Sequence, residues 1–222
     1  MDNAIIAAII GAIATIVAVF IGLRGKKVKK HTPSIHAFKL GYSLVELSRF
    51  ARAKRLRLAD DRPQRRLYEA TLGKLNLLEK TLGLELNVVP SYDEHSDDVL
   101  FSHYKVYFEG FHEKIRHSFE LGTTTGNILL NMLPDYQSFT MQGESRATDF
   151  LVMANRACDR LSSLWQSLFN ESRSHSIGKI RDKVETLKSK KDRASLEALI
   201  KDCQIIAEEF LVEFEERVEE FA

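Results

Sequence analysis

Eight basic side chains within a short stretch are the strongest candidates for chemistry in this sequence. They are Arg49, Arg52, Lys54, Arg55, Arg57, Arg62, Arg65 and Arg66. A guanidinium group donates paired hydrogen bonds to phosphate or carboxylate oxygens. The cluster therefore predicts a binding site for an anion or for a protein partner.

Three kinds of partner are compatible with this cluster. The first is a phosphate-bearing ligand such as a nucleotide or RNA, and the second is an anionic membrane along which a flat amphipathic helix lies. The third is the chain's own acidic surface, supplied by Glu208, Glu209, Glu213, Glu215, Glu216, Glu219 and Glu220. An upright helix would hold the cluster about 40 Å from a membrane, far beyond the screening length of about 8 Å. Only a flat helix would therefore let the membrane attract it.

Several segments of the sequence resemble catalytic or metal-binding motifs but lack residues or spacings that those motifs need. His112 and His117 are five residues apart, whereas a zinc-peptidase helix needs two histidines four apart on one face. Glu109 and His112 form one Glu-x-x-His pair, whereas a di-iron bundle needs two. The segment 122–126, Gly-Thr-Thr-Thr-Gly, lacks the Lys-Ser/Thr ending of a phosphate-binding loop and predicts a loop between helices. We expect no catalytic residue, no metal and no cofactor, and therefore not an enzyme.

The charges are segregated along the chain, although the net charge is only +1. Residues 24–66 carry 14 basic and 3 acidic side chains, whereas residues 67–172 carry 8 basic and 15 acidic ones. A general nucleic-acid binder would be basic overall, and a disordered chain would hold fewer than the 44% apolar residues present here. The sequence predicts a basic front followed by an acidic folded body.

An uncharged apolar segment, 4–23, stands near the N-terminus and predicts a single transmembrane helix. Twenty helical residues span about 30 Å, the thickness of the hydrocarbon core of a bilayer. The basic residues that follow it predict contact with the membrane surface and a cytoplasmic C-terminal side. They are Arg24, Lys26, Lys27, Lys29 and Lys30. The predicted location is a bacterial inner membrane, with the N-terminus outside.

Small residues share one face of this predicted span. They are Ala7, Gly11, Thr15, Ala18 and Gly22. Small side chains let transmembrane helices approach closely, so this face predicts a homo-oligomer. Alanine and glycine are also common in spans that do not associate, and that interpretation stays open.

The remainder of the chain predicts an all-α fold, with one short candidate strand at 84–89. Helices are expected from Pro33 to about residue 59, from Pro63 to a C-cap at Gly83, over 97–121 with an end at Gly122, and over 127–133 with an end at Pro134. Two apolar stripes predict long bundle helices at 147–168 and 192–221, joined by a polar helix at 177–189. Cys158 and Cys203 fall on these stripes and are expected to be buried.

The expected organisation is a short extracytoplasmic end at 1–3, the span at 4–23, a basic linker at 24–32 and a cytosolic helical domain at 33–222. We expect a membrane-anchored interaction protein that self-associates and binds the bilayer and an unknown cytosolic protein or phosphate-bearing ligand. The alternative is an oligomeric, pore-forming or membrane-perturbing effector, as in antiviral defence, that is triggered by an anionic ligand or RNA at the arginine-rich helices.

Overall fold

The computed structural model describes residues 33–55, 62–83, 111–141, 143–189 and 196–221. Within these ranges the chain is all-α and contains no strand, as predicted. The candidate strand at 84–89 lies outside the described residues. The chain divides between Thr123 and Thr124 into two compact units, which are described in turn.

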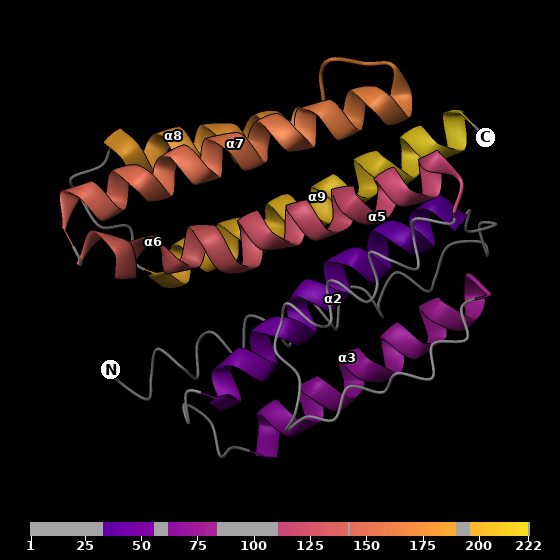
Figure 1. The fold of residues 1–222 in the computed structure, drawn as a ribbon, viewed down its shortest axis with the longest axis horizontal. Helices are drawn as coiled ribbons and strands as arrows, with labels where there is room; N and C mark the ends of the chain where they lie inside the picture. The colour runs from indigo at the N-terminus through magenta and orange to yellow at the C-terminus, as the bar shows by residue number, and fades with distance from the viewer. Residues whose placement is uncertain (1–32, 56–61, 84–110, 142, 190–195, 222) are drawn as a thin grey trace. The chain divides into compact units, whose positions relative to one another are not determined.

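The first unit contains a helical hairpin of α2 (Pro33–Arg55) and α3 (Arg62–Thr81). The two helices pack side by side and run in opposite directions (Figure 1). Pro33 is the first helical residue of α2, as predicted, because proline suits a position whose N–H has no intrahelical partner. Gly83 follows α3 with a φ of +70°, which is the backbone conformation expected of a C-cap glycine.

The middle of helix α2 is buried on all its sides. Every residue from Leu40 to Ser48 is buried, including the polar Ser43, Glu46 and Ser48. An amphipathic surface helix would alternate buried and exposed residues with a period near 3.6. Residues 40–48 of α2 therefore present no exposed face.

A third helix, α5 (Glu113–Gly126), crosses α2 at very short range. A Cβ atom on Gly122 would overlap the carbonyl oxygen of Phe38, and one on Gly41 would overlap the carbonyl oxygen of Phe119. The predicted helix end at Gly122 is therefore wrong, because this glycine allows a close backbone approach within a continuing helix. The predicted loop at 122–126 is wrong for the same reason, since these residues form the last turns of α5.

The start of α5 also differs from the prediction, which ran one helix through 97–121. Residues 111 and 112 are not helical, and α5 begins at Glu113. The Nδ1 atom of His112 accepts a hydrogen bond from the backbone N–H of Lys114 at 3.3 Å. His112 thus acts as an N-cap, which supplies an acceptor to a free N–H of the first turn.

The helix continues past α5 through a π-helical turn, η2 (Asn127–Met132), into α6 (Leu133–Thr140). The backbone N–H of Leu133 bonds to the carbonyl of Ile128, five residues earlier. The predicted helix end at Pro134 is wrong. Proline lacks an N–H and its ring clashes with the carbonyl four residues earlier in an α-helix, and the wider turn that precedes it relieves this conflict.

The second unit is an up-and-down bundle in which η2 and α6 pack with α7 (Glu144–Phe169), α8 (His175–Ser189) and α9 (Leu196–Glu220). Each helix contacts the next, and α9 closes the ring against η2 and α6. Asn170 ends α7 in the left-handed conformation, with a φ of +54°. Its N–H bonds to the carbonyl of Gln166 at 2.8 Å. The two stripes predicted at 147–168 and 192–221 thus form two helices of one bundle.

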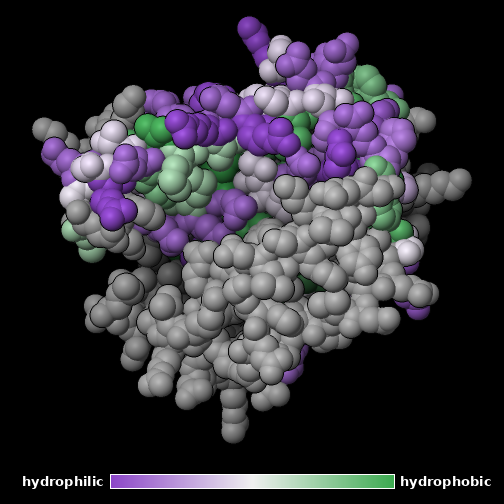
Figure 2. All heavy atoms as spheres, in the orientation of Figure 1, coloured by the Kyte–Doolittle hydropathy of each residue, from purple (hydrophilic) through white to green (hydrophobic). Residues whose placement is uncertain are grey.

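The core of the second unit confirms most of both stripes. Buried members on α7 and α9 are Phe150, Ala154, Cys158, Leu161, Leu164, Trp165, Leu168, Leu199, Cys203, Ile206, Phe210, Phe214 and Val218. Ala147, Leu151 and Ala157 are only half-buried. Trp165 packs against Phe169 and Phe210, with ring centroids 4.6 Å and 5.8 Å away. The opposite side of α7 meets solvent, and Figure 2 shows a mostly hydrophilic surface where this helix lies.

Candidate ligand-binding site

The predicted basic cluster lies at one end of the α2–α3 hairpin, which we call the arginine-rich end. Four of its members belong to the last two turns of α2 and three to the start of α3. Residues 56–61 can bridge at most about 25 Å between the helices. Because α2 and α3 pack side by side in opposite directions, the end of α2 and the start of α3 lie at the same end of the hairpin. Arg57 lies outside the described residues. Among the side chains of the cluster, the structure describes only that of Arg49, which is half-buried.

The arginines at the start of α3 interact unfavourably with the dipole of that helix. Its first turn contains no acidic residue, whereas Arg62, Arg65 and Arg66 lie among its first five residues. The N-terminal end of a helix carries a partial positive charge, which favours acidic side chains and opposes basic ones. Stabilisation of α3 therefore does not explain these arginines, and an external anion would be attracted by them and by the helix end together.

The hairpin is also joined by a buried ion pair that sequence analysis missed. The Oε2 atom of Glu46 on α2 lies 3.9 Å from the Nζ atom of Lys74 on α3. The Glu46 side chain is 1% exposed and that of Lys74 is 21% exposed. Glu46 is the sole acidic residue between positions 3 and 59, which is the signal that marks it in the sequence.

Burial governs the protonation of this pair. It raises the pKa of the Glu46 carboxyl above its ordinary value, and the Lys74 ammonium partly opposes the rise. It lowers the pKa of Lys74, an effect that Glu46 opposes and Lys39 strengthens. Removal of two charges from water can cost more than their attraction returns, so the pair specifies how α2 meets α3 more than it stabilises the hairpin.

Further polar groups line the α2–α3 contact close to this pair. Ser43 lies one turn before Glu46 on α2, and Thr71 lies one turn before Lys74 on α3. Neither hydroxyl oxygen, nor either carboxylate oxygen of Glu46, has a hydrogen-bond partner within the described residues. Buried groups of this kind usually bond to ordered water. The contact between α2 and α3 therefore contains buried polar groups beside the ion pair.

Two glutamates of α9, Glu209 and Glu213, contact α8. The carboxylate of Glu213 accepts hydrogen bonds from the backbone N–H groups of His175 and Ser176, both at 2.9 Å. Burial acts to raise the pKa of Glu213, but hydrogen bonds from Ser176, His175 and Ser174 lower it overall. Glu209 pairs with Lys179 at 2.7 Å. These two glutamates thus hold α8 and α9 together.

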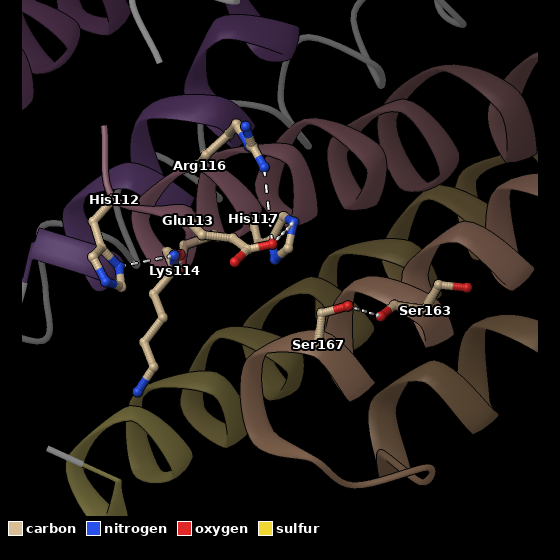
Figure 3. Close-up of polar contacts among 8 residues, drawn as sticks. His112, Glu113, Lys114, Arg116, His117, Ser163 and Ser167 are labelled. Carbon is tan, nitrogen blue, oxygen red and sulfur yellow. Dashed lines mark hydrogen bonds and ion pairs between the residues drawn. The ribbon is translucent and has the colours of Figure 1, made fainter. Parts of the chain in front are cut away.

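The histidine motif near the start of α5 is a set of local contacts. Figure 3 shows Glu113 between Arg116 and His117, while His112 caps the helix. The Oε1 atom of Glu113 lies 3.7 Å from Nε2 of His117 and 3.9 Å from an Arg116 nitrogen. Nowhere in the described ranges do three His, Cys, Asp or Glu residues stand where they could hold a metal ion.

The residues predicted to contact the membrane belong to the N-terminal part of the chain. The span at 4–23, its small-residue face and the basic residues from Arg24 to Lys30 all lie outside the described residues. Of the helices that are described, none combines the length and apolar character needed to cross a membrane.

Comparison of the chain with known protein families, curated proteins and solved structures finds no match.

Proposed function

We propose that this chain is a membrane-anchored helical protein that self-associates and binds a cytosolic partner or a phosphate-bearing ligand through its arginine-rich end. The apolar segment 4–23 supplies the anchor, and the five basic residues from Arg24 to Lys30 keep the helical part on the cytoplasmic side. The face that contains Gly11 and Gly22 supplies the contact between copies.

The observation that carries the binding role is the composition of the start of α3. Arginines occupy a position where helix electrostatics favours acids, and the end of α2 adds the cations Arg52, Lys54 and Arg55. Like charges at this density repel one another unless an anion neutralises them. A phosphate group or an acidic partner surface satisfies this requirement because the arginine fork matches either geometry.

The anchor and the self-association are tested together on the full chain. Light scattering in detergent should give an oligomer for residues 1–222 and a smaller mass for residues 31–222. Gly11→Leu should weaken the oligomer, because a large side chain separates the close-packed faces. A monomer in both forms would make the segment a simple tether and contradict the self-association.

The binding role is tested by charge reversal at the arginine-rich end. Arg65→Glu with Arg66→Glu should strongly weaken binding of a labelled oligoribonucleotide, measured by fluorescence anisotropy, and should flatten its salt dependence. Lys80→Glu changes charge in the last turn of the same helix, at an exposed position, and serves as the control. Equal loss in the control would mean a general charge effect and would contradict a site at the arginine-rich end.

A leakage assay separates this proposal from the effector alternative. Liposomes that contain the full chain should retain a trapped dye when the oligoribonucleotide is added. Ligand-dependent leakage that Gly11→Leu abolishes would instead favour a pore-forming effector. The arginine-rich end would then act as its trigger.

A further inference from the structure

The exposed side of α7 contains two neighbouring apolar residues in its first half. Val152 is 45% exposed and Met153 is 52% exposed. Single apolar residues at a surface are common and need no explanation. These two differ because Asp149 and Arg156 flank them at spacings of three and four residues, which places all four side chains on one face of the helix. We call these four residues the outer face of α7.

The two charges of the outer face have no partner among the residues that the structure describes. Asp149 and Arg156 are exposed, and neither side chain forms an ion pair or a hydrogen bond there. They do not pair with each other, since seven residues separate them by about 10.5 Å along the helix. Asp159, further along α7, pairs with Arg181 of α8 at 3.0 Å. The bundle therefore uses Asp159 and leaves Asp149 and Arg156 available to a partner.

The order of the four residues is self-complementary. The midpoint between positions 149 and 156 is also the midpoint between positions 152 and 153. A two-fold axis through this midpoint, perpendicular to α7, would bring Asp149 of each copy opposite Arg156 of the other. A parallel pair of helices would instead bring Asp149 against Asp149 and Arg156 against Arg156, and like charges repel. The charges thus favour an antiparallel pair.

We propose that the outer face of α7 binds the same face of a second copy of this chain in an antiparallel pair. The pair buries Val152 and Met153 around the axis and forms two Asp149–Arg156 ion pairs. It rests on the proposed self-association, because a contact of two helical turns is smaller than the about 1,000 Å² that a stable interface needs. Anchoring of both copies in one membrane raises their effective concentration, so a contact of this size suffices. The two anchored copies share this axis when α7 lies parallel to the membrane surface.

The test is cysteine cross-linking of the full chain in uncharged detergent. Met153→Cys should give dimers with a short bifunctional maleimide, because position 153 of each copy lies beside the axis. The native Cys158 and Cys203 are buried, so the wild-type chain gives the background. Val212→Cys puts a thiol on α9 at a position as exposed as Val152, and its yield measures chance collisions.

Charge reversal then tests the register of the pair in the Met153→Cys background. Asp149→Arg brings two pairs of arginines together, and Arg156→Asp brings two pairs of aspartates together. Either change alone should lower the yield of cross-linked dimer at least about tenfold. An equal mixture of the two variants should restore the yield, because each arginine then faces an aspartate of the other chain. This rescue also shows that both variants are folded.

Three results would overturn the α7 contact. They are Met153→Cys cross-linking no higher than that of Val212→Cys, single charge variants that cross-link as well as their parent, and a mixture that gives no rescue. Light scattering separates this failure from that of the span. An oligomer whose chains do not cross-link at position 153 would overturn the α7 contact alone, whereas cross-linking that Gly11→Leu leaves unchanged would support it and contradict association through the span.

Discussion

Replacement of Gly122 by alanine tests the closest contact in the first unit. The new Cβ atom would overlap the carbonyl oxygen of Phe38 and lie 2.9 Å from its carbonyl carbon. Ordinary carbon contacts are about 3.5–4.0 Å, so α2 and α5 must separate by about 1 Å. Backbone atoms cannot rotate away as a side chain can, and the strain therefore falls on the packing of both helices.

The expected magnitude follows from two opposed effects. Overpacking in a close-packed interior costs about 1–3 kcal/mol. Alanine recovers up to about 1 kcal/mol because it favours the helix more than glycine does. Because the overlap is with backbone atoms, the overpacking cost lies in the upper part of that range, about 2–3 kcal/mol. The net loss for Gly122→Ala is then about 1–2 kcal/mol, or a fall of about 2–8 °C in Tm for a chain of this size.

Gly73 provides the matched control, since it lies in α3 of the same unit and faces open space. Gly73→Ala should raise stability by up to about 1 kcal/mol, because only the helix propensity changes. Urea unfolding of the full chain in detergent, followed by far-ultraviolet circular dichroism, measures both variants. If Gly122→Ala were as stabilising as Gly73→Ala, the backbones of α2 and α5 would not cross at this glycine.

Three further predictions concern ionisable groups. Glu213→Gln should cost about 1–2 kcal/mol at pH 7 by urea unfolding, through the lost cap of α8. Because the folded-state pKa of Glu213 lies below its ordinary value of 4.5, the wild-type advantage is complete above that pH and is lost as the pH falls through the lowered pKa. A difference that persists at pH 2 would contradict this. Lys74→Met should destabilise the hairpin by about 3 kcal/mol, because it leaves the Glu46 carboxylate buried without its partner. The further change Glu46→Met should restore the stability, since no buried charge remains. A double variant no more stable than Lys74→Met alone would refute the buried pair. Burial raises the pKa of Cys158 to about 11, so in a Cys203→Ser background a thiol reagent at pH 8 should label unfolded but not folded protein.

The long helices of the second unit could be predicted from the sequence because one physical rule determines them. Apolar residues at spacings of three and four must share a face, and burial of that face forms the bundle. The stripe around Leu161 and Leu164 on α7 and that around Phe210 and Phe214 on α9 are buried as expected. No element far away in the chain is needed to make this inference.

The helix ends predicted at Gly122 and Pro134 are wrong because each of these residue types has two common roles in helices. Glycine ends a helix or permits a close approach, and proline ends a helix or follows a widened turn. The choice depends on Phe38 for the glycine and on the π-helical turn at 127–132 for the proline. Neither partner can be identified from the local sequence.

The buried pair of Glu46 and Lys74 could not be predicted from the sequence for a different reason. Glu46 stands among apolar residues, and its isolation as an acid could have drawn attention to it. Its partner Lys74 is 28 residues away, on a helix that offers Lys80 as another cation. Only the packing of α2 against α3 selects Lys74.

The contacts of α9 bear on which anion meets the arginine-rich end. Glu209 and Glu213 are used to hold α8, and Glu220 pairs with Arg217 at 2.6 Å. If these carboxylates also neutralised the arginine-rich end, α8 would lose its cap and one of its ion pairs. Neutralisation by Glu209 or Glu213 would thus destabilise the bundle that presents them. A phosphate-bearing ligand or an acidic partner has no such cost, because it brings its charge from outside.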